Sequence, residues 1–209
     1  MIEVTHFGDN CEPYMIINDI LKNKKKHLFM LGMYAFNNIL SYLKDNNYEK
    51  IYDKEDLVIE PNQVVKHSKY NFIFNHDYQV SNSQINNYDF IRERFDLKIK
   101  NFKEMLSTEN MCVFLSFSEN VPCLKLNEML DWLSLNKKNF HLMIFTCCKH
   151  DTICDSEFCS IINLEHSYHE WWLMEKTPKM ILYEEIYEKF LNCLNQRNIQ
   201  HDFPAVFEL

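Results

Sequence analysis

Apolar residues recur along the whole chain in two alternating patterns. Short compact or alternating apolar runs, typical of strands, occupy residues 2–7, 70–74, 112–117 and 140–145. Apolar side chains at three- to four-residue intervals, which predict amphipathic helices, occupy residues 33–44, 85–106, 124–135 and 180–194. Because parallel strands need crossover connections, the alternation predicts an α/β fold with three layers: a largely parallel sheet flanked by helices.

The length and composition fit one core. The chain has 209 residues, 46% of them hydrophobic and 14% aromatic, as in ordinary globular proteins. No internal repeat, long linker or low-complexity tract divides it. We therefore expect residues 1–209 to form a single domain.

The net charge of the chain limits the kinds of partner that we expect it to bind. With 30 acidic and 22 basic side chains the formal net charge is -8, which repels phosphate backbones and anionic membrane surfaces. We expect neither a nucleic-acid partner nor a membrane partner. The only two glycines, Gly8 and Gly32, exclude glycine-rich phosphate loops, and we expect no cofactor.

Several features favour the cytoplasm. The start of the chain lacks the basic and apolar pattern of a signal peptide, and eight cysteines in a chain of this length fit reduced thiols. The abundance of Asn, Lys, Ile and Tyr is typical of AT-rich genomes, including those of large DNA viruses. For a viral chain the expected location is the host cytoplasm, and the expected partner is an unknown substrate or a host protein.

Polar side chains follow the predicted strands. The working crevice of a parallel sheet lies outside the carboxyl ends of its strands. The residues that follow three of these strands are Asp9, Asn10 and Cys11, then His76 and Asp77, then Glu119 and Asn120. The sequence therefore predicts a site at this edge of the sheet.

Cys11 is the candidate nucleophile. Asn10 is a suitable N-cap, and Pro13 suits the first turn of a helix. Unpaired amides at a helix N-terminus favour a thiolate and can hold an oxyanion. The alternative is that Cys11 is an inert residue packed at a strand–helix junction.

His76 is the candidate base, since a thiol nucleophile needs a group that titrates near neutrality. Asp77 orients His76 only if the strand has already ended, because neighbours on a strand point to opposite faces. Asp9, Asn10, Glu119 or Asn120 are the alternatives for a third group or an oxyanion contact. The competing interpretation of His76 and Asp77 is a surface turn.

These motifs resemble the DUF1796 family, described as papain-like cysteine peptidases. Phe7-Gly8-Asp9-Asn10-Cys11-Glu12 is similar to the family's Leu-Gly-x-Asn-Cys-Glu opening, and Phe74-Asn75-His76-Asp77-Tyr78 is similar to its Phe-x-His-Asp-Phe motif. The likeness spans about residues 4–145. It implies Cys11 as the nucleophile and His76 as its base. It also implies an antiparallel sheet, whereas the alternating pattern predicts a parallel one.

Two positions depart from the family. Its Pro-Phe-Asp-Trp segment appears as Met33-Tyr34-Ala35-Phe36, which loses the acid, and the arginine after its strand is replaced near Ser116. We therefore predict a thiol hydrolase or acyltransferase of unknown substrate. The alternative is a catalytically degenerate interaction protein on the same fold.

A second group of possible ligands lies between residues 147 and 178. Zinc takes four nitrogen or sulfur ligands, and Cys154, Cys159, His166 and His169 could supply them. Close Cys-x-x-Cys pairs are absent, so we expect no metal and keep zinc as the alternative.

Overall fold

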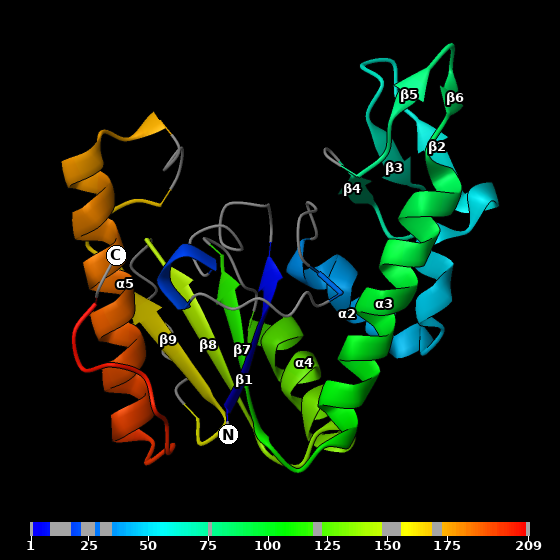
Figure 1. Ribbon diagram of the computed structural model, residues 1–209. Coiled ribbons are helices and arrows are strands. Elements are labelled where there is room, and N and C mark those ends of the chain that lie inside the picture. Colours follow the sequence, from blue (N-terminus) through cyan, green and yellow to red (C-terminus); the bar gives the residue numbers. More distant parts are fainter. Residues whose placement is uncertain are drawn as a thin grey trace.

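The computed structural model describes residues 2–8, 18–21, 28–29, 35–74, 77–118, 123–147, 156–168 and 173–207. A four-stranded parallel sheet lies at its centre (Figure 1). Its strands, in spatial order, are β1 (Ile2–Gly8), β7 (Met111–Phe117), β8 (Phe140–Thr146) and β9 (Cys159–Asn163). The predicted α/β fold with a largely parallel sheet is confirmed.

Helices cover both faces of this sheet (Figure 1). One face carries α2 (Phe36–Asp45), α3 (Tyr88–Ser107) and α4 (Cys123–Asn136). The other carries α5 (Lys176–Gln196), together with the helical residues 18–21. This is the three-layer arrangement that the sequence pattern predicts.

The side chains of β7 explain the two-sided covering. Phe114 points to the α4 face, where it stacks on Phe7 with ring centroids 5.0 Å apart. Phe117 points to the α5 face, where it stacks on Phe145 at 4.9 Å. Successive residues of a strand alternate between faces, so a strand buried on both sides needs a continuous apolar run.

A second, antiparallel sheet lies beside α3 (Figure 1). Its strands are β2 (Leu57–Ile59), β3 (Val65–His67) and β4 (Phe72–Phe74), preceded by the 3-10 helices η1 (Tyr48–Tyr52) and η2 (Lys54–Asp56). A hairpin of β5 (Val80–Ser81) and β6 (Gln84–Ile85) follows.

The strand predicted over 70–74 exists, but its expected place in the parallel sheet is wrong. It is β4, paired antiparallel with β3. The connection is a short turn in which Asn71 takes a positive φ of 56° and donates its backbone N–H to the His67 carbonyl at 2.8 Å. So short a connection allows only antiparallel pairing, because a parallel one needs a crossover.

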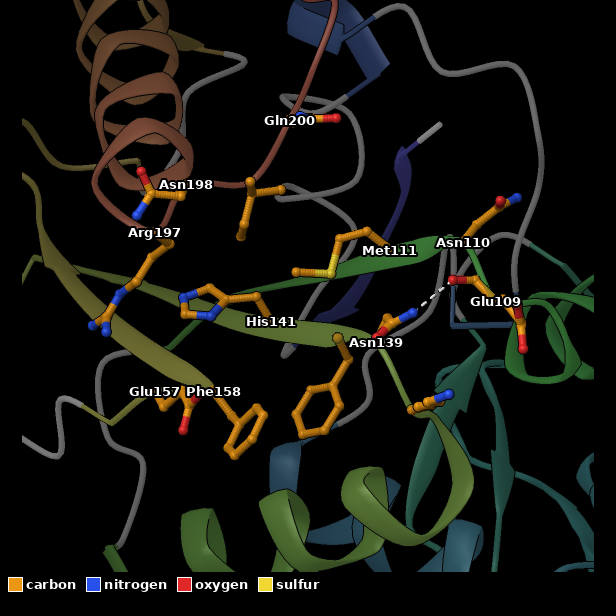
Figure 2. Close-up of a pocket in the computed structure, with 13 residues that line it drawn as sticks. Glu109, Asn110, Met111, Asn139, His141, Glu157, Phe158, Arg197, Asn198 and Gln200 are labelled. Atoms are coloured by element: carbon orange, nitrogen blue, oxygen red, sulfur yellow. Dashed lines mark hydrogen bonds between the residues drawn. The ribbon is translucent and has the colours of Figure 1, made fainter.

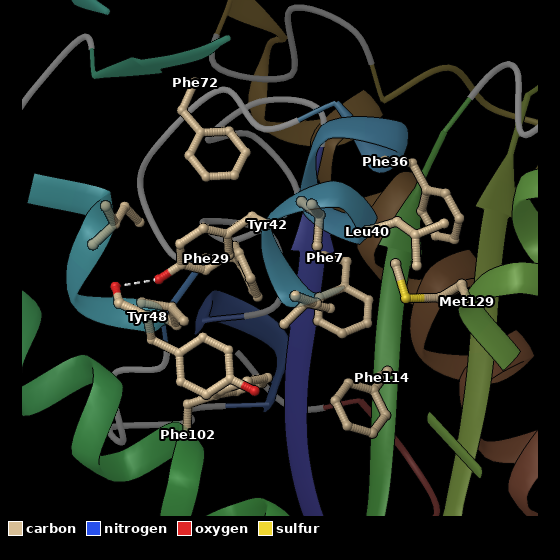
Figure 3. Close-up of a cluster of buried hydrophobic side chains, with 14 of the residues drawn as sticks. Phe7, Phe29, Phe36, Leu40, Tyr42, Tyr48, Phe72, Phe102, Phe114 and Met129 are labelled. Atoms are coloured by element: carbon tan, nitrogen blue, oxygen red, sulfur yellow. Dashed lines mark hydrogen bonds between the residues drawn. The ribbon is translucent and has the colours of Figure 1, made fainter. Parts of the chain in front are cut away.

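The two sheets nevertheless share one apolar core (Figure 3). Phe7 of β1 contacts the ring of Phe29 at 5.4 Å between centroids, and Phe29 contacts Tyr42 of α2 at 5.9 Å. Tyr42 in turn contacts Phe72 of β4 at 5.4 Å. These edge-to-face contacts connect the carboxyl half of β1 to Phe72, the first residue of β4, through three ring pairs.

The helices predicted over 33–44, 85–106, 124–135 and 180–194 are confirmed with shifted ends, the largest shift being four residues at the start of α5. Of the helix predicted to begin near Cys11, only residues 18–21 are described, and they are helical. A buried lysine marks the end of α3. Lys137 is 2% exposed, and its Nζ donates to the Met105 carbonyl at 2.8 Å. The lysine thus satisfies a carbonyl of the last turn of α3, which has no partner within the helix.

Among the described residues, no helix is long and apolar enough to cross a membrane.

Candidate functional site

Most members of the predicted catalytic set lie outside the described residues. These are Asp9, Asn10, Cys11, His76, Glu119 and Asn120. The described neighbours are Gly8, the last residue of β1, and Asp77, the third residue after β4. Asp77 is thus the one proposed catalytic residue whose surroundings are known.

Asp77 is an almost completely buried carboxylate. It is 4% exposed, and its Oδ2 has no hydrogen-bond partner within the part of the chain that is described. Its Oδ1 lies 3.8 Å from a guanidinium nitrogen of Arg94, on α3. Burying a carboxylate with one unpaired oxygen is unfavourable, and such atoms mark places where a further donor belongs.

The turn that holds Asp77 is fixed by an asparagine. Asn87 donates from Nδ2 to the Asp77 carbonyl at 2.9 Å, and its Oδ1 accepts the backbone N–H of Gln79 at 2.7 Å. β4 ends at Phe74, so Asp77 lies beyond the strand. Asp77 itself lies in a turn, and His76 lies outside the described residues.

Tyr78 adds a second buried polar atom beside this carboxylate. It is 8% exposed and its hydroxyl has no hydrogen-bond partner among the described residues. Burial raises the pKa of Tyr78 far above its usual value, and the charge of Asp77 raises it further. The phenol therefore stays protonated and is a donor, not a base, at neutral pH.

The structure separates the two described zinc candidates. Cys159 begins β9 and is fully buried in the core on the α4 face. His166 lies beyond the other end of that strand, where its Nδ1 is 2.7 Å from Glu185 Oε2 on α5. The length of β9 alone places them roughly 13 Å apart at about 3.3 Å per residue, too far for one metal ion. Cys154 and His169 lie outside the described residues.

No group of three or more His, Cys, Asp or Glu side chains suited to a metal ion occurs in the described part of the chain. Glu185 instead serves the turn after β9. It accepts the backbone N–H of His166 at 3.0 Å and pairs with Lys189 at 3.1 Å. Burial raises the pKa of Glu185, but the hydrogen bonds from the backbone N–H of Glu165, from His166 and from Lys189 outweigh it and hold the pKa below the usual range.

A polar cluster that the sequence analysis did not single out lies between the sheet and the C-terminal part of α5. His141 of β8 is 1% exposed, and its Nε2 lies 3.0 Å from Ser160 Oγ of β9 and 3.9 Å from Cys193 Sγ of α5. Arg197 donates from Nε to Ser160 Oγ at 3.3 Å.

This cluster borders a cleft of about 550 Å³ at the amino edge of the sheet (Figure 2). The sequence predicted a site at the opposite edge, where parallel sheets usually carry their sites. The one feature of the sequence that could have pointed to this cluster is His141, a histidine inside the apolar strand predicted over 140–145.

No family model, curated protein or solved structure matches this chain. The fold defines an α/β protein with a parallel sheet, a smaller antiparallel sheet and two separate places of concentrated polar chemistry.

Proposed function

We propose that this chain is a thiol hydrolase or acyltransferase in which Cys11 is the nucleophile, His76 moves protons and Asp77 orients His76. The observation that carries the proposal is the buried Asp77 carboxylate, whose Oδ2 has no described partner. A carboxylate that accepts the N–H of an imidazole fixes its tautomer and stabilises its protonated form. His76 precedes Asp77 directly in the chain.

The apolar core shared by β1 and β4 supports a pairing of Cys11 with His76. Ring contacts connect Phe7 to Phe72 through Phe29 and Tyr42. Cys11 follows the end of β1 by three residues, and His76 follows the end of β4 by two. Both candidate residues thus follow strands whose side chains pack into one core, which supports the proposal.

The reaction proceeds in two steps that balance. The Cys11 thiolate attacks the acyl carbon, the bond to the leaving group breaks, and protonated His76 gives the leaving group its proton. Neutral His76 then takes a proton from water, or from an acceptor nucleophile, which attacks the thioester and releases Cys11 as a thiolate. Helix amides near residues 11–13 would hold the oxyanion of both steps.

An activated acyl ester such as p-nitrophenyl acetate tests this. We expect a burst of one equivalent of p-nitrophenol followed by continued turnover. Cys11→Ala abolishes both phases, and His76→Gln slows turnover by about 10²–10⁴-fold because the proton shuttle is lost. Cys147→Ala is the matched control, since Cys147 is a partly exposed cysteine that directly follows β8. Full turnover in Cys11→Ala contradicts the proposal.

One observation favours the alternative, an interaction protein on a degenerate enzyme fold. Ala35 stands where the family has its acid, and it occupies the N-cap of α2 with no side-chain cap. A protein partner whose capture survives Cys11→Ala, together with absent turnover in the wild-type chain, would favour that alternative.

A further inference from the structure

The cleft at the amino edge of the sheet is separate from the proposed thiol site. It is bordered by the starts of β7 and β8, the turn before β9 and the residues that follow α5 (Figure 2). The predicted catalytic residues follow the carboxyl ends of strands instead. At about 550 Å³ the cleft is in the range of small-molecule sites.

An exposed phenyl ring forms part of the wall. Phe158 is 43% exposed, although it stacks on Phe140, with centroids 5.3 Å apart and planes 22° apart. Phe140 is 4% exposed and so holds Phe158 from the core side. A rigid ring with exposed surface is a stacking platform for a flat ligand.

Carboxamide groups border the same space. Asn198, two residues after the end of α5, takes a positive φ of 54°. The next residue, Ile199, donates its N–H to the Leu194 carbonyl at 2.9 Å, which fixes this turn. Asn139 donates from Nδ2 to the Glu109 carbonyl at 2.8 Å, which leaves its Oδ1 as an acceptor. Gln200 also lines the cleft (Figure 2).

Charges in the cleft balance. Lys138 and Arg197 oppose Glu109 and Glu157, so the site has no excess of one sign. Arg197 is positioned by its bond to Ser160, which is itself bonded to the buried His141. The cleft therefore offers both donors and acceptors around an aromatic surface, and favours an uncharged ligand that carries both.

We propose that this cleft binds a free nucleoside, with its base stacked on Phe158 and its edge hydrogen-bonded by the carboxamide and carboxylate side chains. Asn and Gln pair with base edges that present one donor and one acceptor, and Glu accepts from exocyclic amines. The balanced charge favours a nucleoside over a polynucleotide, which would require a basic surface.

The proposal can be tested by saturation-transfer NMR on the full chain with adenosine, guanosine, cytidine and uridine. Calorimetry then measures the dissociation constant of the nucleoside that binds most strongly. We expect saturable binding of at least one nucleoside. Phe158→Ala weakens that binding about tenfold or more, as loss of base stacking does, while Phe158→Trp retains it. Phe90→Ala is the matched control, because Phe90 is an exposed phenylalanine of α3 outside the cleft.

Circular dichroism of each variant checks that the fold is kept. Absence of transfer from all four nucleosides overturns the proposal, and so does a dissociation constant that is equal in wild type and Phe158→Ala. Binding lost in Cys11→Ala but kept in Phe158→Ala would move the nucleoside to the thiol site and also overturn it. Binding that persists in Cys11→Ala supports it whether or not the chain hydrolyses esters.

Discussion

His67 is a buried histidine that acts as a structural connector. It is fully buried, its Nε2 lies 2.8 Å from the Lys50 carbonyl, and the Tyr70 backbone N–H donates to its Nδ1 at 3.4 Å. Nδ1 is thus an acceptor and Nε2 the donor, which describes a neutral ring. Burial lowers the pKa of His67, while the bond to the Lys50 carbonyl raises it less.

The lowered pKa of His67 predicts a loss of stability in mild acid. The unfolded ring titrates near 6.5 and the folded ring lower, so the unfolded state binds more protons as the pH falls through about 6.5. We expect the free energy of unfolding to fall as the pH is lowered through about 6.5, because protonation then favours the unfolded state.

Urea denaturation at several pH values measures this. His67→Gln should flatten the slope between about pH 5 and 6.5, the window below the unfolded pKa. An identical slope in wild type and His67→Gln would show that another group carries the pH dependence.

For Asp77, the sequence suggested a role but not the surroundings of the side chain. The sequence selected it as a partner for His76 but left a surface turn equally open. Burial of its side chain, the contact with Arg94 and the asparagine that fixes its carbonyl come from α3 and the turn before it. These contacts join segments that no local pattern connects.

At the scale of elements, α2 begins without a cap. Ala35 has φ -56° and ψ 139°, the extended geometry of an N-cap, and its carbonyl accepts the Asn38 N–H at 2.8 Å. Its side chain is exposed and has no oxygen to accept an amide of the first turn.

Ala35→Asp should therefore stabilise the protein by about 1 kcal/mol, through a carboxylate that caps the first-turn amides and complements the helix dipole. Thermal and urea unfolding measure the gain. Ala35→Leu, which has no acceptor, is the control. Equal stability of Ala35→Asp and Ala35→Leu would contradict the capping argument.

Long periodic helices were predictable because their apolar stripes persist over several turns, as in α3 with Ile91, Phe95, Ile99 and Phe102 buried. The strands of two or three residues in the small sheets are too short to show a period. β9 was missed for a related reason: its five residues alternate little and lie in a stretch that stood out for Cys and His.

At the scale of the whole molecule, the sequence indicated which strands are buried but not which sheet they join. Phe72-Ile73-Phe74 carries the same apolar character as the β7 run, yet it pairs antiparallel in the smaller sheet. The apolar character of a strand indicates that it is buried. The direction in which it pairs depends on the segments that connect it to its neighbours. The amino-edge cleft combines four separate segments, at residues 109–111, 138–141, 157–158 and 197–200, which no motif unites.

The most direct test of the proposed function is the pH profile of Cys11 alkylation. Iodoacetamide labelling between about pH 5 and 9, quantified on the Cys11 peptide by mass spectrometry, reports the thiolate fraction. We predict a midpoint well below about 8.5, the value of an ordinary thiol, and a shift toward 8.5 in His76→Gln, because the imidazolium that stabilises the thiolate is lost. A Cys11 that titrates near 8.5 in the wild-type chain and does not respond to His76→Gln would contradict the thiol-enzyme account.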